Sequence, residues 1–291
     1  MTPRFTLYIP TKGRADSRLT SKALSAMGCP HFLIVEPQEV EEYERASRGS
    51  LATILPLDLS FKDHYELCDG LGLSKSTGPG PARNFAWAHS IVRGDAWHWV
   101  MDDNITAFRR LHRGAKIKVS DGAIFAAMED FVLRYENVAM AGPNYGMFAY
   151  EADASTIKPF VVNTRIYSCN LIRNDVPQRW RGRYNEDTIL SLDLIKAGWC
   201  TVQFNAFLQD KIRTQTLGGG NTAEFYAAEG TALKSEMLKR VHPDCVRLVM
   251  KYGRHHHSIE YSRVKSSPLR RMINAPTPRG DYGMRLASVA R

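Results

Sequence analysis

The chain of 291 residues lacks the long apolar runs and the paired cysteines that mark several classes of protein. No stretch approaches the roughly 18 consecutive apolar residues that a membrane-spanning helix needs, and no basic-then-apolar leader opens the sequence. Its five cysteines are widely spaced and include no C-x-x-C pair. This spacing argues against a disulfide framework or a zinc site and favours reduced thiols. We therefore expect a protein of the cytoplasm.

Two common glycine-rich nucleotide-binding motifs are also missing. The sequence contains neither the G-x-x-x-x-G-K-[ST] spacing of a P-loop nor the G-x-G-x-x-G of a dinucleotide site. No internal repeat is visible. Hydrophobic residues make up 44% and charged residues 24% of the chain, which is ordinary for a globular protein. A chain of this length can bury a substantial core, in one large α/β domain with an appendage or in two small domains.

The first part of the sequence alternates between strand and helix patterns. Because this alternation is typical of parallel strands joined by right-handed crossovers, we expect an α/β fold with a mostly parallel central sheet flanked by helices. The expected strands are 5–10, 31–35 and 51–57, and the expected helices are 17–27 and 40–46.

The most informative stretch is an apolar, aromatic run from Trp97 to Met101 that is followed by Asp102, Asp103 and Asn104. The run reads as a buried strand, and open α/β sheets bind ligands at the carboxyl edge of their strands. Adjacent acids are costly to desolvate, so a Mg²⁺ or Mn²⁺ ion that carries a diphosphate would explain their placement. A solvated loop or a helix cap after the strand is the alternative.

Two further polar clusters begin predicted helices. The sequence G-P-G-P-A-R-N places Arg83 in a first helical turn, where it can pair with a diphosphate or with an acid of the metal motif. Glu186 and Asp187 begin a later helix, either as residues stabilised by the helix dipole or as a general base for an acceptor hydroxyl. Polar residues interleaved in the strand-like segment 161–172 line a pocket or form the wet face of an edge strand, and the pattern slightly favours the edge strand.

Positive charge is concentrated near the end of the chain. From Lys239 to Arg291 there are twelve Lys and Arg residues against three acids, and this excess of nine equals the net charge of the whole chain. The pattern indicates either a polyanionic partner or a basic, partly disordered tail. Residues 244–252 are predicted to be helical, and the segment from Ser266 onward is predicted to be extended or partly disordered.

In order along the chain, the motifs I-P-T-K-G-R, G-P-A-R-N, W-V-M-D-D-N, Y-N-E-D and G-G-G-N resemble those of a GT-A fold glycosyltransferase. More narrowly, the series resembles the phage TET-associated glycosyltransferases, which add sugars to 5-hydroxymethylcytosine in DNA. The resemblance spans about residues 4–260. It implies a GT-A-like domain over 1–235 and a basic extension over 236–291 that packs on this domain and contacts DNA. It also implies residence in the host cytoplasm if a phage encodes the protein.

The resemblance further implies metal-dependent transfer from a nucleotide sugar, with a UDP-sugar as the expected donor. The attacking hydroxymethyl group would be reached in the major groove or after the nucleotide is flipped out. If a carboxylate acts as base opposite the leaving group, the transfer inverts the anomeric carbon. A retaining enzyme would not need that base.

Roles for individual residues follow from the resemblance. The metal would be held by Asp103 with Asp102, and His256 is a candidate for a further contact. Asp187 would be the base, and Glu186 would hold sugar hydroxyls. Nucleic-acid contacts would come partly from an Arg-rich turn in which Trp180 stacks or wedges, and an exposed turn around a buried tryptophan is the alternative. The residues expected at the nucleotide sugar are Thr11, Lys12, Arg14, Glu36, Arg83 and Asp102. Those expected at the nucleic acid are Arg179, Trp180, Arg181, Arg183, Arg254 and His255.

Two other functions are compatible with this pattern. A sugar-1-phosphate nucleotidylyltransferase shares the α/β plan and metal use, but the chain has no early G-x-G-T-R-x-x-P signature. The other alternative is a catalytically silent nucleic-acid-binding protein on a transferase-like fold.

Overall fold

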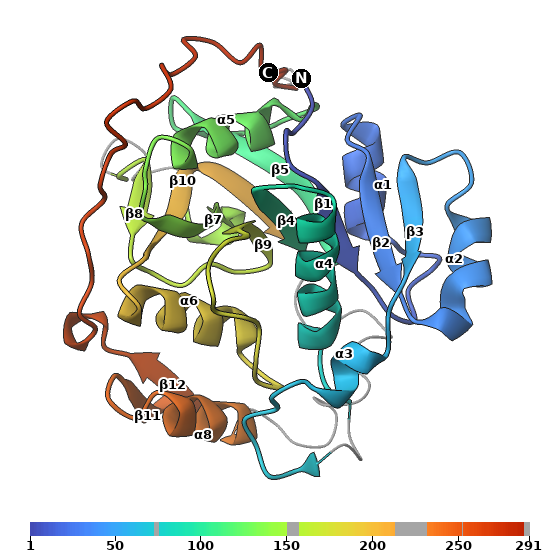
Figure 1. Ribbon diagram of the computed structural model, residues 1–291. Helices are drawn as coiled ribbons and strands as arrows, with labels where there is room; N and C mark the ends of the chain where they lie inside the picture. Colours follow the sequence, from blue (N-terminus) through green and yellow to red (C-terminus); the bar gives the residue numbers. More distant parts are fainter. Residues whose placement is uncertain (73–75, 150–156, 213–231, 252, 288–291) are drawn as a thin grey trace.

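The computed structural model describes residues 1–72, 76–149, 157–212, 232–251 and 253–287 (Figure 1). The glycine-rich motif Gly218 to Asn221 lies outside these ranges. The strands of the large sheet are β1 (Leu7–Pro10), β2 (His31–Val35), β3 (Ala52–Pro56), β4 (Trp97–Met101), β5 (Ile105–His112), β6 (Ala115–Lys118), β7 (Val138–Tyr145), β8 (Phe160–Val162), β9 (Cys169–Arg173) and β10 (Cys200–Lys211). The α-helices are α1 (Leu19–Ala26), α2 (Val40–Ala46), α3 (Ser60–Asp63), α4 (Gly80–Val92), α5 (Ala123–Val132), α6 (Glu186–Lys196) and α8 (Ala232–Val241).

The large sheet is mixed, and its strands run in the order β3-β2-β1-β4-β9-β7-β10-β5-β6, with β8 paired to β10. Strands β1 to β4 pair in parallel, and β7 pairs in parallel with β10. Strand β9 is antiparallel to both of its neighbours, β4 and β7. The predicted α/β fold, with a central sheet flanked by helices, is confirmed and is compatible with a GT-A-like single domain; the parallel strands are concentrated in the β3-β2-β1-β4 half.

The uninterrupted apolar run of β4 is explained by burial on both faces of the sheet. All five of its residues are buried. Trp97, Trp99 and Met101 belong to the core between the sheet and helices α1, α2 and α5, whereas Val100 faces the core beneath α4 and α6. The strand therefore ends at the interior of the sheet, and the residues that follow it emerge at the carboxyl edge.

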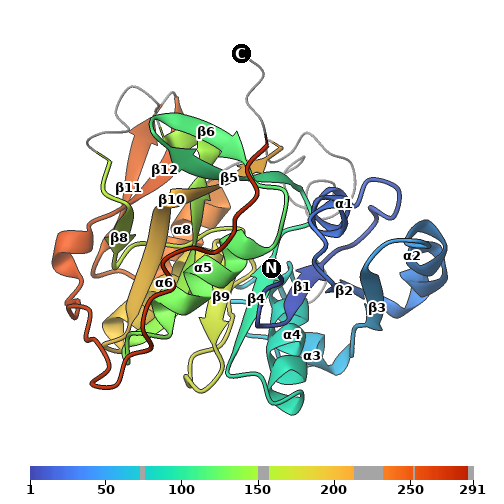
Figure 2. The ribbon, with the colours of Figure 1, turned by 90° about the horizontal axis from the view of Figure 1, so that it is seen from above.

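A further layer covers the outer side of α6 (Figures 1 and 2). Ile189, Leu192 and Ile195 of α6 pack against α8 and a hairpin formed by β11 (Val246–Lys251) and β12 (Arg254–Ile259). The prediction of a helix over 244–252 is wrong, because this segment supplies a strand of the hairpin. Among the helices in the described ranges, none has the length and apolar character required to cross a membrane.

The last part of the described chain is an extended strap that runs back over the domain (Figure 2). Asn137, just before β7, donates to the carbonyl of Pro268 at 2.8 Å and accepts from the amide of Arg270 at 2.8 Å. Bridges at Arg271 and Leu286 continue the contact. The strap therefore crosses near the amino end of β7, the edge opposite to the one where β4 releases its acids. Its arginines pair with acids of the domain, as in Arg270–Glu136, Arg279–Asp130 and Arg285–Asp121.

Candidate active site

Asp102, the first residue after β4, is held by two cations and a hydroxyl. Its Oδ1 accepts from Arg83 Nη2 at 2.7 Å, and its Oδ2 lies 2.5 Å from Lys211 Nζ and 2.8 Å from Ser168 Oγ. Burial alone would favour the neutral acid, but Lys211 and Arg83 hold the pKa of Asp102 well below its usual range. The carboxylate is therefore ionised and fixed in place.

Arg83 joins Asp102 to the amino end of α6. Its side chain is buried, and its Nη1 donates to Asp187 and lies 3.4 Å from Glu186 Oε1. The guanidinium also lies 4.6 Å from the centre of the Trp180 ring. One buried cation thus contacts carboxylates from two distant segments of the chain, and the predicted pairing of Arg83 with the acidic motif is observed.

The glycines before Arg83 allow this placement. Gly78 has a φ of +75°, and a Cβ there would lie 2.7 Å from the carbonyl oxygen of Arg183. A Cβ at Gly80 would lie 1.8 Å from the hydroxyl of Tyr65. Because these backbones approach so closely, larger residues would push the first turn of α4 away from the site.

Asp187 is buried at the start of α6 and accepts three hydrogen bonds. Oδ1 accepts from Arg83 and from Asn170 Nδ2 at 3.1 Å, and Oδ2 accepts from the amide of Ser168 at 3.2 Å. Burial raises the pKa of Asp187, the charge of Arg83 opposes the rise, and the nearby charge of Asp102 adds to it. This carboxyl is held rigidly and is more basic than an ordinary aspartate.

Glu186 precedes Asp187 and has a different environment. Burial raises the pKa of Glu186 to about 7, with Arg83 opposing the rise and the negative charge of Asp187 adding to it. Glu186 therefore changes its charge near neutral pH.

Asp103 points to a second group of residues, at the end of β1. Its Oδ1 lies 2.5 Å from Arg14 Nη1, and its Oδ2 accepts from Thr11 Oγ1 at 2.9 Å. Tyr43 supports both partners, because its hydroxyl lies 2.9 Å from Thr11 Oγ1 and accepts from the Arg14 amide at 3.0 Å. The structure therefore brings Thr11 and Arg14, predicted at the nucleotide, into contact with Asp103, predicted at the metal.

The other two residues predicted at the nucleotide sugar also meet. Lys12 Nζ lies 3.4 Å from Glu36 Oε1 at the end of β2, and Lys62 Nζ lies 2.5 Å from the same oxygen. Burial would raise the pKa of Glu36, but hydrogen bonds from Lys62 and Gln38 bring it below its usual value. Glu36 is therefore an ionised acceptor at the carboxyl edge of β2, next to β1.

A family model described as TET-associated glycosyltransferase matches residues 5–220, more than half of the chain. This chain belongs to the TET-associated glycosyltransferase family. A comparison with curated proteins finds no match. The matched region runs from before β1 to beyond β10, so it contains all the site residues described above.

Several residues of this glycosyltransferase site were not found from sequence. Lys211, the last residue of β10, and Ser168, just before β9, both contact Asp102. Asn170 in β9 contacts Asp187, and the hydroxyl of Tyr145 lies 2.7 Å from Ser168 Oγ. The polar pattern of 161–172 was attributed to an edge strand, which is wrong for β9 because this strand lies between β4 and β7. That pattern was the one available signal for Ser168 and Asn170.

The predicted metal ligands are only partly assembled. His256 lies in β12, paired with Val249, and the described residues contain no group of three His, Cys, Asp or Glu side chains that could hold a metal. The structure therefore does not join His256 to Asp102 and Asp103. The side-chain oxygen of Asn104 is buried and has no hydrogen-bond donor among the described residues. Carboxylate and amide oxygens are the ligand type that Mg²⁺ prefers, but the oxygens of Asp102 and Asp103 already contact cationic and hydroxyl groups of the protein.

All four residues predicted for nucleic acid in the Arg-rich turn make contacts within the protein, including Arg179, which donates to the carbonyls of Val176 and Gln178 and whose guanidinium lies 4.4 Å from the centre of the Trp87 ring. Trp180 is 2% exposed beneath Arg83, so it cannot stack on a base, and the buried-tryptophan alternative is the correct one. Arg183 is 1% exposed and its Nε lies 2.6 Å from Asp69 Oδ2. Arg181 forms two hydrogen bonds with Asp193, at 2.8 and 3.0 Å. Arg179 is exposed, and so are Arg254 and His255 on the hairpin.

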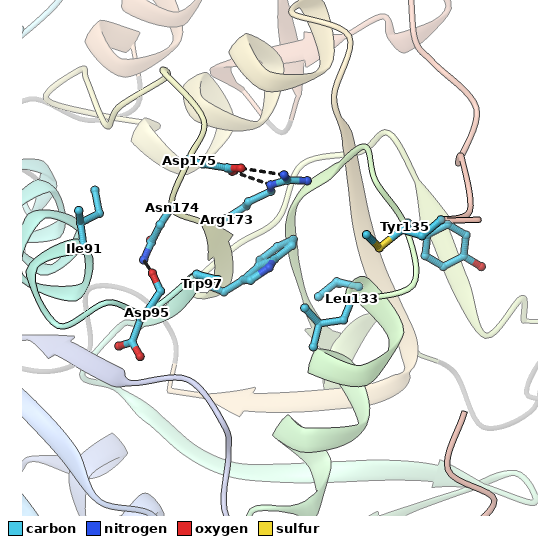
Figure 3. A pocket seen from close by; sticks show the side chains of 11 residues that line it. Ile91, Asp95, Trp97, Leu133, Tyr135, Arg173, Asn174 and Asp175 are labelled. Carbon is cyan, nitrogen blue, oxygen red and sulfur yellow. Dashed lines mark hydrogen bonds and ion pairs between the residues drawn. The ribbon is translucent and has the colours of Figure 1, made fainter. Parts of the chain in front are cut away.

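Two pockets of about 430 Å³ lie at opposite edges of the sheet. The apolar one, shown in Figure 3, is lined by Trp97 at the start of β4, by Tyr135 after α5 and by Met272 of the strap. It lies at the amino end of β4 and is therefore separate from the carboxylates. The polar pocket includes Tyr145, whose hydroxyl contacts Ser168, so it adjoins the site.

Proposed function

We propose that this glycosyltransferase moves a sugar from a nucleotide sugar, a UDP-sugar by family expectation, to the hydroxymethyl group of 5-hydroxymethylcytosine in DNA. The observation that carries the proposal is the contact of one buried arginine, Arg83, with Asp102 on one side and with Asp187 on the other. This contact supports the proposal, because Asp102 on the expected leaving-group side and Asp187 on the expected acceptor side bind the same guanidinium. Family membership supplies the reaction class.

The residues near β1 and β2 would bind the nucleotide. Thr11 and Arg14 offer a hydroxyl and a cation beside Asp103, and Lys12 with Glu36 offers a charged pair that can hold ribose or base. Arg83 and Lys211 are the cations that would face the diphosphate. A divalent cation bound at Asp102 and Asp103, Mn²⁺ or Mg²⁺, would offset charge that develops on the diphosphate as it leaves.

Asp187 is the proposed base. Its Oδ2 accepts a single hydrogen bond from the described residues, from the Ser168 amide, and a carboxylate oxygen has room for a second. A proton from the hydroxymethyl group moves to this oxygen as the hydroxymethyl oxygen bonds to the anomeric carbon and the bond from that carbon to the diphosphate breaks. Attack from the side opposite the leaving group gives inversion. Glu186 beside it would hold sugar hydroxyls.

The deciding experiment is mass spectrometry of DNA containing hydroxymethylcytosine after incubation with the protein, Mn²⁺ and a panel of UDP-sugars. Addition of a sugar mass to the modified base is the expected result. Unmodified cytosine DNA is the matched control and should gain no mass. Absence of the product with every donor would leave the nucleic-acid-binding alternative as the better account.

Asp103→Ala is expected to abolish sugar transfer while DNA binding survives, because Asp103 serves the donor side only. Chelation with EDTA should have the same effect and should be reversed by Mn²⁺ or Mg²⁺. Transfer and DNA gel-shift assays on the same preparations test this. The exposed Asp16, two residues beyond Arg14, provides the control variant Asp16→Ala, which should retain transfer. Transfer that survives both Asp103→Ala and chelation would exclude the proposed role.

Transfer is expected to decline as the pH is lowered through about 7. The pKa of Glu186 is raised to about 7, so below this pH the side chain gains a proton and no longer presents an ionised acceptor to a sugar hydroxyl. The profile of kcat/KM against pH should therefore rise through about 7. In Glu186→Gln the rise of kcat/KM through pH 7 should disappear, and kcat/KM should be lower and should depend less on pH. An unchanged rise in that variant would assign the titration to another group.

A further inference from the structure

The polar pocket next to Ser168, called the Tyr145 pocket below, has walls from the sheet and from the C-terminal hairpin. It is lined by, among others, Asn144, Tyr145, Arg165, Tyr167, Gln203 and His257. Tyr145 ends β7 and Tyr167 precedes Ser168, while His257 reaches the pocket from β12. The hairpin packs on α6 through its own apolar core, so this wall is fixed to the helix that begins with Glu186 and Asp187.

The floor of the pocket is joined to the carboxylates by one residue. The hydroxyl of Tyr145 lies 2.7 Å from Ser168 Oγ, and this oxygen donates to Asp102 at 2.8 Å. The amide of Ser168 donates to Asp187 Oδ2 at 3.2 Å. A group seated against Tyr145 and Tyr167 is therefore beside the proposed base and beside the acid at the end of β4.

One wall is a column of flat groups. The rings of Tyr145 and Tyr167 are stacked, with centroids 5.9 Å apart and planes inclined by 20°. The guanidinium of Arg165 lies 4.8 Å from the centre of the Tyr167 ring. Aromatic rings and arginine planes are the surfaces on which proteins stack nucleobases that have left the helix.

The polar groups that the described residues give the pocket include two amides and no acid. Gln203 Nε2 donates to Asn144 Oδ1 at 3.1 Å, and this oxygen also accepts from the Tyr145 amide, while Asn144 Nδ2 donates to Asn205. The second N–H of each amide and the Gln203 oxygen are the groups that can match the hydrogen-bonding edge of a base. Burial lowers the pKa of His257 to about 4, so its ring is neutral at pH 7. Among the described residues that line the pocket none is acidic, which favours a neutral planar ligand near phosphate over a cation.

The rim adds two exposed apolar side chains. Met147 and Phe148 follow Tyr145, and they are 63% and 52% exposed. Apolar side chains of this kind insert between base steps when a protein unstacks DNA. Phe148, which also lines the pocket, is therefore available to contact a base step beside it.

We propose that the Tyr145 pocket receives the acceptor pyrimidine after it has been extruded from the DNA duplex, which rests on the proposed function. The base stacks on the tyrosine column and its hydrogen-bonding edge meets Asn144 and Gln203. Its 5-hydroxymethyl group points past Ser168 toward Asp187. This assigns base flipping to the enzyme and separates the acceptor pocket, between β7 and the hairpin, from the donor site at β1 and β2.

The test uses Tyr167→Ala in the full chain, with two readouts. The first is KM for duplex DNA containing hydroxymethylcytosine, measured beside the affinity for UDP by calorimetry. Loss of one stacking surface is expected to raise the KM for DNA about 10- to 100-fold and to leave the affinity for UDP unchanged. Tyr167→Phe keeps the ring and should restore the greater part of the loss. Tyr135→Ala, in the opposite pocket of Figure 3, is the matched control and should alter neither value.

The second readout does not depend on sugar transfer. 2-Aminopurine placed next to the target base of a duplex becomes brighter when that base leaves the stack, and its fluorescence is expected to rise with the wild-type protein and not with Tyr167→Ala. If the wild type transfers no sugar but still raises the fluorescence, the proposed function fails and the pocket proposal stands. If the wild type gives transfer without a change in fluorescence, base extrusion is wrong.

Other results of the KM and UDP-affinity measurements would also test the proposal. Weaker UDP binding with an unchanged KM for DNA would assign the pocket to the donor and overturn the proposal. If Tyr167→Ala changes neither the KM for DNA nor the affinity for UDP, the pocket does not bind a substrate. If Tyr167→Ala does not fold, as judged by its circular dichroism spectrum, Gln203→Leu removes the amide at similar volume. The same rise in KM is then expected, and its absence would overturn the role of the amides.

Discussion

Asp187→Asn is expected to lower kcat for sugar transfer by about 10²- to 10⁴-fold, the contribution typical of a positioned general base. Asparagine has nearly the same shape and can still accept from Arg83, but it cannot take the proton of the attacking hydroxyl. The KM for DNA should change little, because the substitution keeps the shape of the side chain and leaves the DNA-binding surface unchanged. Single-turnover assays with hydroxymethylcytosine DNA and a UDP-sugar measure the effect.

A matched control lies two turns along the same helix. Asp193 also pairs with an arginine, Arg181, but it does not contact the site residues. Asp193→Asn should therefore keep kcat within a few-fold of the wild-type value. If Asp187→Asn retained near wild-type kcat while Glu186→Gln lost it, the base would be Glu186, and the assignment of these two carboxyls would have to be exchanged.

The parts of the site that were predicted from sequence are those fixed by local patterns. The run from Trp97 to Met101 is apolar at every position because both faces of β4 are covered, so the position of Asp102 and Asp103 at a sheet edge was readable. Glycine and proline before Arg83 likewise marked the start of a helix. In both cases the information lies within about ten residues of the functional side chain.

The parts that were missed depend on contacts between distant segments. Lys211 lies 109 residues from Asp102 in the sequence, and nothing in the alternation of β10 distinguishes its last residue as a site residue. Ser168 and Asn170 were visible as polar positions, but only the sheet order reveals that β9 is central. Trp180 and Arg183 were assigned to the nucleic acid but are buried within the protein. A cluster of arginines in the sequence does not reveal which of them pair with acids of the protein.

The hairpin shows a similar limit. Residues 244–252 contain apolar positions that suit either a helix or a strand, and the pairing of β11 with the histidine-rich β12 decides between them. The same hairpin supplies a wall of the Tyr145 pocket. Excess positive charge at the C-terminal end therefore divides into two parts. Arg270, Arg279 and Arg285 of the strap are paired with acids of the domain, whereas the hairpin lies beside the acceptor pocket and presents Arg254 and His255 to solvent.

Arg83→Met is expected to lower the free energy of unfolding by about 3–5 kcal/mol and to abolish transfer, because it removes the cation shared by one buried and two partly buried carboxyls. Arg83 is 2% exposed and contacts Asp187, Asp102 and Glu186, so its loss leaves negative charge that water solvates poorly. Without it, the pKa values of Asp187 and Glu186 in the folded protein rise further above their unfolded values, and the pKa of Asp102 is held less far below its own. The instability should therefore be greatest at high pH and should shrink as the pH falls and the carboxyls gain protons.

Urea unfolding of the wild type and of Arg83→Met at pH 8 and pH 5.5 measures this difference. Arg93→Met is the control, since Arg93 is 47% exposed and lies 4.0 Å from Asp95, and exposed pairs contribute about 0–1 kcal/mol. Arg83→Lys keeps one charge but cannot reach carboxylates on two sides with a planar fork, so it should recover part of the stability and little of the activity. Equal stability of Arg83→Met and wild type at pH 8 would mean that Lys211 alone compensates the acids, and the central role of Arg83 would be wrong.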